Sequence, residues 1–134
     1  MKLEFLTFDF EKFASEMANL KSKKGFDYLV TIVGEDFGPE EGLGCIYILE
    51  NSETHQRCSV KMLAKVQKDI PYIPSVINIW KVANLLEREV YVFYVIVFLG
   101  HPDMRRLFLR SDFKGYPFRK DWEFNDDYTL EDDN

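Results

Sequence analysis

The chain has 134 residues, of which 46% are hydrophobic and 16% aromatic, so it can form one domain with a packed core rather than a disordered segment. Its net charge of −6 is spread unevenly: residues 1–100 carry −3, residues 101–122 carry +3, and residues 123–134 carry −6. Because an acidic tail follows the basic stretch, nucleic-acid binding by the whole domain is disfavoured.

The cysteine and histidine counts argue against a metal or redox centre. Cys45 and Cys58 are the two cysteines, and His55 and His101 are the two histidines. Iron–sulfur clusters and structural zinc sites usually need four protein ligands, so we predict no metal-binding residue in this chain. Two cysteines form no disulfide framework, which fits a reducing compartment.

The chain shows no secretory or membrane-spanning pattern. No basic segment precedes an apolar core at the N-terminus, as a secretory signal would require. The longest apolar run, Val90–Leu99, has ten residues, about half of what spans a bilayer. We therefore expect a soluble protein that can still be peripheral to a membrane.

The first predicted elements are a short strand and a helix. Lys2–Phe8 favours a strand, and Asp9 is placed to cap a helix over roughly residues 10–23. Three lysines crowd the last turn of that helix, and Gly25 is expected to end it. The helix has one apolar stripe, formed by Phe10, Phe13, Ala14, Met17 and Leu20.

A β-sheet is predicted next. Phe26–Val33, Cys45–Glu50 and about His55–Leu63 favour strands, separated by a loop over Gly34–Gly44 and a turn over Asn51–Thr54. A regular hairpin with Glu50 opposite His55 would make Cys45 and Cys58 diagonal neighbours on one face. Diagonal Cβ atoms lie about 7–8 Å apart, too far for an unstrained disulfide.

The second half is predicted to contain a connector, a helix and a strand. Ala64–Pro74 is expected to be a connector, after which Ser75 caps a second helix. Successive β-branched residues at 95–97 favour a strand, and Gly100 breaks it. The predicted apolar stripe of the helix is Ile79, Ala83, Leu86, Val90 and Phe93.

The charged motif of this helix is the triplet Glu87, Arg88 and Glu89. Consecutive helical residues point about 100° apart, so Glu87 faces the same way as Tyr91 and Tyr94, whereas Arg88 and Glu89 point elsewhere. Paired-carboxylate catalysis is therefore disfavoured. Two alternatives stay open: an inward ion pair with one solvated acid, or contact with a partner.

The stretch after Gly100 combines a histidine with many cations and aromatic rings. His101, Asp103 and Glu87 could serve acid–base chemistry, but no nucleophile motif, cofactor loop or metal spacing accompanies them. Basic residues alternate with aromatic ones over 105–120, a composition that suits single-stranded nucleic acid or a protein interface equally well. The basic residues are Arg105, Arg106, Arg110, Lys114, Arg119 and Lys120.

The segment PSVINIWKVANLLEREVYVFYVIVFLGHPDMRRLFL, with GYPFRKD after it, resembles the thirty-kilodalton subunit (the C subunit) of proton-pumping NADH:quinone oxidoreductase, respiratory complex I. The resemblance covers roughly residues 9–121. Two positions depart from the family pattern: Val92 replaces an acid, and Val95 replaces a glycine. If that glycine ends the helix in a left-handed conformation, valine there costs roughly 1–2 kcal/mol or shifts the helix end. The matching positions are Pro74–Val76, Trp80, Glu87–Tyr91, Gly100–Asp103, Arg105–Leu107 and Gly115–Asp121, with FDYLV at 26–30.

The resemblance, with the elements above, implies an α+β fold: a mixed, largely antiparallel sheet of about four to five strands, two main helices and an irregular C-terminal segment. We expect one domain over residues 1–121 and an acidic, flexible tail over 122–134. The implied function is that of a non-redox structural subunit in the peripheral arm of the complex, with no catalysis by the isolated chain. The chain is expected to bind no cofactor, whereas the complex uses FMN, iron–sulfur clusters, NADH and quinone.

The implied partners are other subunits of the complex, chiefly the quinone-site subunit (the D subunit) and also the B and I subunits, with no nucleic acid. The implied location is peripheral, on the cytoplasmic face of the bacterial inner membrane or the mitochondrial matrix side. Two alternatives remain: a nucleic-acid-binding module using residues 105–120, or the equivalent subunit of a homologous membrane-bound hydrogenase. The predicted interface residues are Glu87, Arg88, Glu89, Tyr91, His101, Pro102, Asp103, Arg105, Arg106, Tyr116, Arg119, Lys120 and Asp121.

Overall fold

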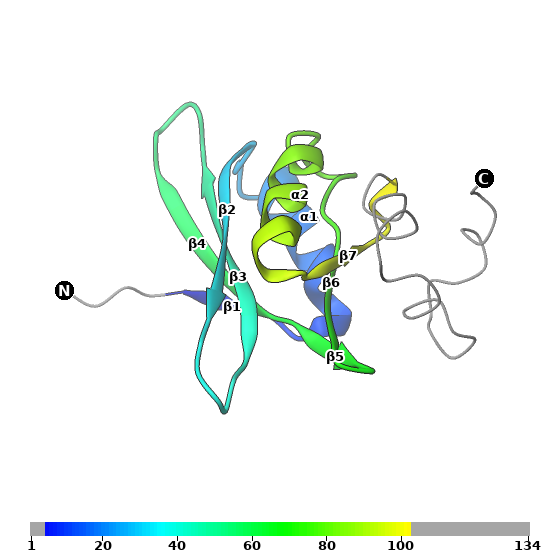
Figure 1. The fold of residues 1–134 in the computed structure, drawn as a ribbon. Helices are drawn as coiled ribbons and strands as arrows, with labels where there is room; N and C mark the ends of the chain where they lie inside the picture. The colour runs from blue at the N-terminus through cyan, green and yellow to red at the C-terminus, as the bar shows by residue number, and fades with distance from the viewer. Residues whose placement is uncertain (1–4, 103–134) are drawn as a thin grey trace.

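The structure, a computed structural model, describes residues 5–102, which form an α+β fold (Figure 1). The α+β prediction is confirmed, but the strands of these residues form two sheets, not one. No helix within this part of the chain has the length and apolar character needed to cross a membrane. In chain order the elements are β1 (Leu6–Thr7), η1 (Phe10–Lys12), α1 (Phe13–Ser22), β2 (Tyr28–Asp36), β3 (Leu43–Glu50), β4 (Arg57–Leu63), β5 (Lys65–Gln67), β6 (Ile70–Pro74), α2 (Ala83–Tyr94) and β7 (Val97–Leu99).

The larger sheet has the strand order β1-β4-β3-β2. Strands β2, β3 and β4 pair antiparallel, whereas the two-residue β1 pairs with β4 in parallel. Residues of β3 alternate between the buried core and the opposite face, so Cys45, Tyr47 and Leu49 all point inward. The three strands predicted over residues 26–63 are therefore present, with shifted ends.

The predicted register of the β3–β4 hairpin is wrong by two residues. Glu50 lies opposite Arg57 rather than His55, and Cys45 lies opposite Met62. Cys45 and Cys58 still share a face, but they are not diagonal neighbours, because Cys58 is four strand positions from Met62, about 13 Å away. Both cysteines are free thiols.

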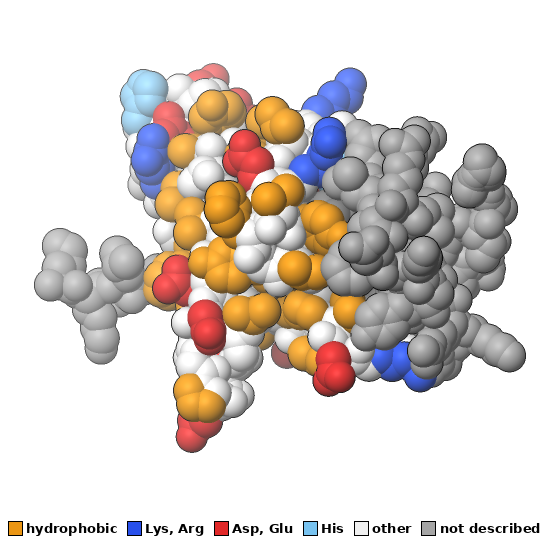
Figure 2. All heavy atoms as spheres, in the orientation of Figure 1, with side chains coloured by type: hydrophobic (Ala, Val, Ile, Leu, Met, Phe, Trp, Pro, Cys, Tyr) orange, Lys and Arg blue, Asp and Glu red, His pale blue; other side chains and the backbone are white. Residues whose placement is uncertain are grey.

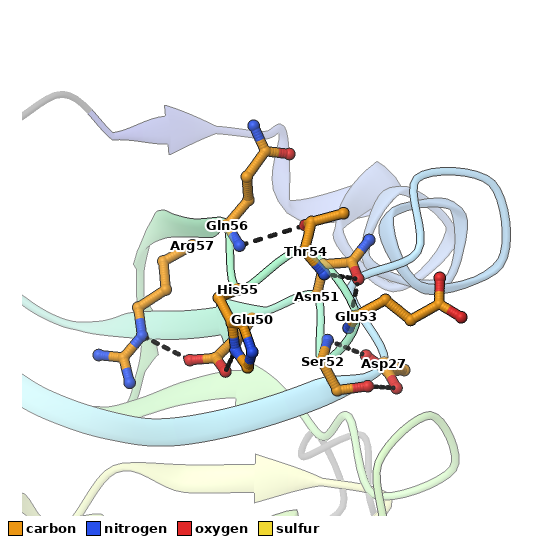
Figure 3. A network of polar contacts seen from close by, with 9 residues as sticks. All are labelled: Asp27, Glu50, Asn51, Ser52, Glu53, Thr54, His55, Gln56 and Arg57. Atoms are coloured by element: carbon orange, nitrogen blue, oxygen red, sulfur yellow. Dashed lines mark hydrogen bonds and ion pairs between the residues drawn. The ribbon is translucent and has the colours of Figure 1, made fainter.

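Side-chain hydrogen bonds at the hairpin tip explain that register (Figure 3). The Asn51 carboxamide oxygen accepts hydrogen bonds from the Glu53 and Thr54 amides, at 2.9 and 3.1 Å, so the turn begins at Asn51. His55 then adopts a left-handed conformation with φ 64°, and strand pairing resumes only after it. The Asp27 carboxylate accepts from the Ser52 amide and hydroxyl, which fastens this tip to the start of β2.

The smaller sheet has the order β5-β6-β7 and contains the segment that was predicted to be a connector. That prediction is wrong because Lys65–Gln67 and Ile70–Pro74 pair as a short hairpin. Strand β6 also pairs in parallel with β7, across the crossover that contains α2. Strand β6 tolerates its two prolines because each pairs with only one neighbouring strand. Pro71 pairs with β5 and not with β7, and Pro74 pairs with β7 and not with β5, so neither needs a backbone N–H toward the unpaired side.

Both helices cover the same face of the larger sheet (Figure 1). From α1, Phe13 packs against Tyr47 with ring centroids 5.3 Å apart, and Met17 and Leu20 are buried beside it. The predicted helix over 10–23 is thus confirmed, beginning with a 3₁₀ turn. Asp9 occupies the N-cap position, but its side chain makes no capping hydrogen bond.

Helix α2 begins at Ala83, eight residues after the predicted cap at Ser75. The intervening residues form turns that are anchored elsewhere. The Trp80 indole nitrogen donates to the Phe26 carbonyl at 3.3 Å, and the Lys21 ammonium donates to the Ile79 carbonyl at 2.7 Å. Because these contacts hold the segment against α1 and β2, they compete with a continuous helix.

Helix α2 ends beside Val95, one of the two positions at which the sequence departs from the family pattern. The helix ends at Tyr94, and Val95 adopts a left-handed conformation with φ 56° and ψ 33°. Its amide donates to the Tyr91 carbonyl at 2.8 Å. Valine therefore occupies the conformation that favours glycine, which costs about 1–2 kcal/mol. Strand β7 follows, as predicted, and Gly100 ends it with φ 93°.

Candidate functional site

Glu87 is the centre of the candidate site, because it is a fully buried acid on the inner face of α2. One carboxylate oxygen accepts a hydrogen bond from the Ser75 hydroxyl at 2.6 Å, and the other accepts from the Val76 amide at 2.8 Å. Ser75 Oγ in turn accepts from the Ile77 amide at 3.1 Å. Ser75 thus joins α2 to the end of β6 instead of capping a helix.

The environment of Glu87 favours its protonated form. Burial raises the pKa of Glu87 to about 7, against the lowering effect of the hydrogen bonds from Ser75 and Val76. Within residues 5–102 no lysine or arginine forms an ion pair with it. Tyr47 and Cys45 from β3 lie close enough that the Glu87 charge raises their pKa values, in addition to the larger effect of burial.

His101 is the other buried polar side chain among the described residues, with 2% of its surface exposed. Its Nε2 lies 2.8 Å from the carbonyl oxygen of Asn84, near the start of α2. Since a carbonyl only accepts, Nε2 must carry a proton and donate. His101 therefore ties the chain after β7 to α2, about one helical turn before Glu87.

The charged triplet divides as its helical spacing predicts. Glu87 and Tyr91 are buried, Arg88 is half-buried, and Glu89 is exposed. Of the two alternatives for Glu87, an inward acid and a partner contact, the burial of the side chain favours the inward acid. Its partners within residues 5–102 are the hydrogen-bond donors of Ser75 and Val76 rather than a cation. The predicted interface role of Glu87, Tyr91 and His101 stays a prediction.

The remaining predicted interface residues fall in two groups. Pro102 is described and exposed. The others lie outside the described residues, so their predicted role stays a prediction. They are Asp103, Arg105, Arg106, Tyr116, Arg119, Lys120 and Asp121.

Residues 5–102 contain no metal-binding cluster, and one cavity that they form lies away from Glu87. No group of three or more His, Cys, Asp or Glu side chains that could hold a metal occurs in residues 5–102. A cavity of about 480 Å³ lies between β1 and the β4–β5 junction, and neither Glu87 nor His101 lines it. Its lysines are paired with acids, Lys61 with Glu41 and Lys65 with Glu11, both at 3.0 Å.

The structure also shows two features that the sequence did not predict. Tyr47 has a fully buried hydroxyl without a hydrogen-bond partner in the described part of the chain, close to Glu87. Phe93 was predicted to point inward, but it is 80% exposed. The residues of α2 that are buried are Ala83, Glu87, Val90 and Tyr91, so the buried face of the helix is rotated away from Phe93. The signal for this face was the helical spacing of Glu87 with Ala83, Val90 and Tyr91, which a stripe chosen from apolar residues alone leaves out.

The chain matches known proteins over most of its length. Residues 6–128 match the family model described as "Respiratory-chain NADH dehydrogenase, 30 Kd subunit". The C/D subunit of NADH-quinone oxidoreductase from Phocaeicola vulgatus is 49% identical over 113 residues, which are 84% of this chain and 21% of that protein. The C subunit of NADH-quinone oxidoreductase from Chloroherpeton thalassium is 44% identical over 105 residues, 77% of this chain and 42% of that protein.

A solved structure has the same fold. It is that of Nqo5, as the trypsin-resistant fragment 1–134, and it matches with a TM-score of 0.64 and 36% sequence identity. The match covers 72% of this chain and 79% of that one. By contrast, the chain spans less than half the length of the two curated relatives.

Proposed function

Because this chain belongs to the family of the 30-kDa subunit of respiratory-chain NADH dehydrogenase, we propose that it is a non-redox structural subunit in the peripheral arm of NADH:quinone oxidoreductase. It docks against the quinone-site D subunit, near the B and I subunits. In this position it supports electron transfer from NADH to quinone, coupled to proton translocation. The family match over residues 6–128 carries this proposal.

The redox groups belong to the other subunits. FMN, the iron–sulfur clusters, NADH and quinone are bound elsewhere in the complex, and the isolated chain catalyses no reaction. The two cysteines support this, since they are too few for a cluster and lie on different strands. The arm lies peripherally, on the cytoplasmic face of the bacterial inner membrane or the matrix side in mitochondria.

The D subunit is the preferred partner because of the relatives' organisation. The Phocaeicola vulgatus protein is named as a C/D subunit, and this chain matches 21% of its length. One polypeptide there bears both subunit names, so the two parts are held at high effective concentration. The described geometry adds that Glu87 and His101 fix α2 against β6 and β7.

Charge reversal tests the docking surface. We expect Arg105→Glu with Arg106→Glu to reduce co-purification of this chain with the D, B and I subunits, because opposite charges steer and orient protein association. The matched control is Lys23→Glu with Lys24→Glu, which reverses two exposed cations after α1. If the arginine variant assembles into the arm as well as the wild type, the arginines are not part of the docking surface.

A further inference from the structure

The outward face of α2 is apolar. Four of the exposed side chains there are Val82, Leu85, Val92 and Phe93, at 44%, 57%, 69% and 80% exposure. They follow one another at helical spacing on the side opposite the buried positions, with Glu89 among them. We call these four residues the α2 patch.

The α2 patch inverts the usual pattern of a surface helix. Such a helix normally buries its apolar side chains and exposes its charged ones. Here the fully buried positions include Glu87, while Phe93 is among the most exposed large side chains of the described chain. Figure 2 shows hydrophobic side chains gathered at the centre of the visible face, where Figure 1 draws α2.

The area and composition of the patch indicate an interface. Its members together expose on the order of a few hundred Å², the size of the largest apolar patch on a typical monomeric protein, and such a patch is often functional. A large exposed aromatic such as Phe93, which lies at the C-terminal end of the patch, is the kind of residue that dominates binding energy. The patch also surrounds Glu89, one of the predicted interface residues.

We propose that the α2 patch is an apolar docking site for the D subunit, an inference that rests on the proposed function. The D subunit is the occupant because one relative bears both subunit names on a single chain, of which this chain matches only 21%. A partner held permanently in place can cover an apolar face, and permanent interfaces are the more hydrophobic class. The facing surface of the D subunit is apolar and carries one cation or hydrogen-bond donor opposite Glu89.

Val92 extends the apolar surface next to Phe93, and it is 69% exposed. We therefore expect the D subunit to present apolar atoms to Val92 as well as to Phe93.

Three single substitutions of the full chain test the patch. Phe93→Ser and Val92→Ser remove apolar surface from it, and Val66→Ser is the matched control, since Val66 on β5 is 66% exposed. All three side chains point to solvent, so circular dichroism and thermal melting should match the wild type. Binding to the purified D subunit of the same complex is then titrated for each variant.

We expect Phe93→Ser to raise the dissociation constant at least about tenfold and Val92→Ser about threefold, with Val66→Ser within about twofold. Equal affinity of Phe93→Ser and the wild type overturns the proposal but leaves the proposed function standing. An equal loss in Val66→Ser also overturns it, because the effect would then be general surface hydrophobicity.

Two further outcomes separate the partner from the function. If the wild type binds no subunit of the complex, both the proposed function and the α2 docking site fail. If light scattering shows the isolated chain to be a dimer that Phe93→Ser dissociates, while affinity for the D subunit is unchanged, the occupant is a second copy. That result overturns the assignment of the patch and leaves the proposed function standing.

Discussion

A single residue, Glu87, shows how far sequence reasoning reaches at this site. Its helical spacing predicted that it shares a face with Tyr91 and Tyr94, but an inward acid and a partner contact both stayed open, and the structure buries it fully. Its partners could not be predicted, because Ser75 was expected to cap the helix and instead binds the carboxylate. Which polar groups meet in a core depends on where each element starts, and that has a weak local signal.

The raised pKa of Glu87 predicts a stability that falls as pH rises. The unfolded chain loses this proton near pH 4.5, whereas the folded chain keeps it until about pH 7. Unfolding in that window releases a proton, so stability falls through it by an amount on the order of 3 kcal/mol and levels off above pH 7.

Glu87→Gln should therefore be more stable than the wild type at pH 8 and lose that advantage at pH 5. The oxygen of the glutamine carboxamide can still accept from the Val76 N–H, and its NH2 group can donate to the Ser75 hydroxyl. Urea unfolding of both proteins at pH 5, 6, 7 and 8 measures the difference, with Glu89→Gln as the control for removal of a charge. Parallel pH profiles for Glu87→Gln and the wild type would contradict the prediction.

At the scale of elements, strands with alternating or β-branched residues were predictable and their pairing was not. Strands β2, β3 and β4 lie close to the predicted ranges. The predicted β3–β4 register was wrong because the Asn51 side chain and the left-handed backbone of His55 define a longer turn than composition alone indicates. Strands β5 and β6 were missed because they are short and contain two prolines.

The β5–β6 hairpin offers a test of turn chemistry. Its two-residue loop, Lys68 and Asp69, has φ of 53° and 67°, a type I′ pattern that favours Asn-Gly. Asp69→Gly should stabilise the chain by about 1 kcal/mol, because glycine adopts positive φ without steric cost. Glu40→Gly, in the β2–β3 loop where φ is not positive, should not stabilise it. Thermal unfolding measures both, and an equal effect at the two sites would argue against the turn.

At the scale of the whole molecule, the α+β class was predictable and the division into two sheets was not. Each sheet contains a parallel pair that joins distant segments, β1 with β4 and β6 with β7. Such pairings leave no local pattern in the sequence. Helix α2 connects the two sheets, since it packs on β2 and leads into β7.

Gly34 controls how closely α2 approaches the larger sheet. A methyl group added there would overlap the Tyr94 ring and lie 3.2 Å from the Val90 side chain. Gly34→Ala should therefore destabilise the fold by about 1–3 kcal/mol. In a Tyr94→Ala background the same substitution should cost less, because the obstructing ring is gone. A double-mutant cycle by urea unfolding measures this coupling, and additive effects would show that the two residues do not compete for space.

Valine at position 95 is one base change from glycine, because every valine codon becomes a glycine codon when its second base changes. Glycine, which adopts this left-handed conformation without strain, is therefore a single mutation away. The side chain of Val95 packs against the hydrophobic core, and burying a valine contributes about as much as its left-handed backbone costs. Replacing Val95 with glycine is therefore expected to change folding stability little.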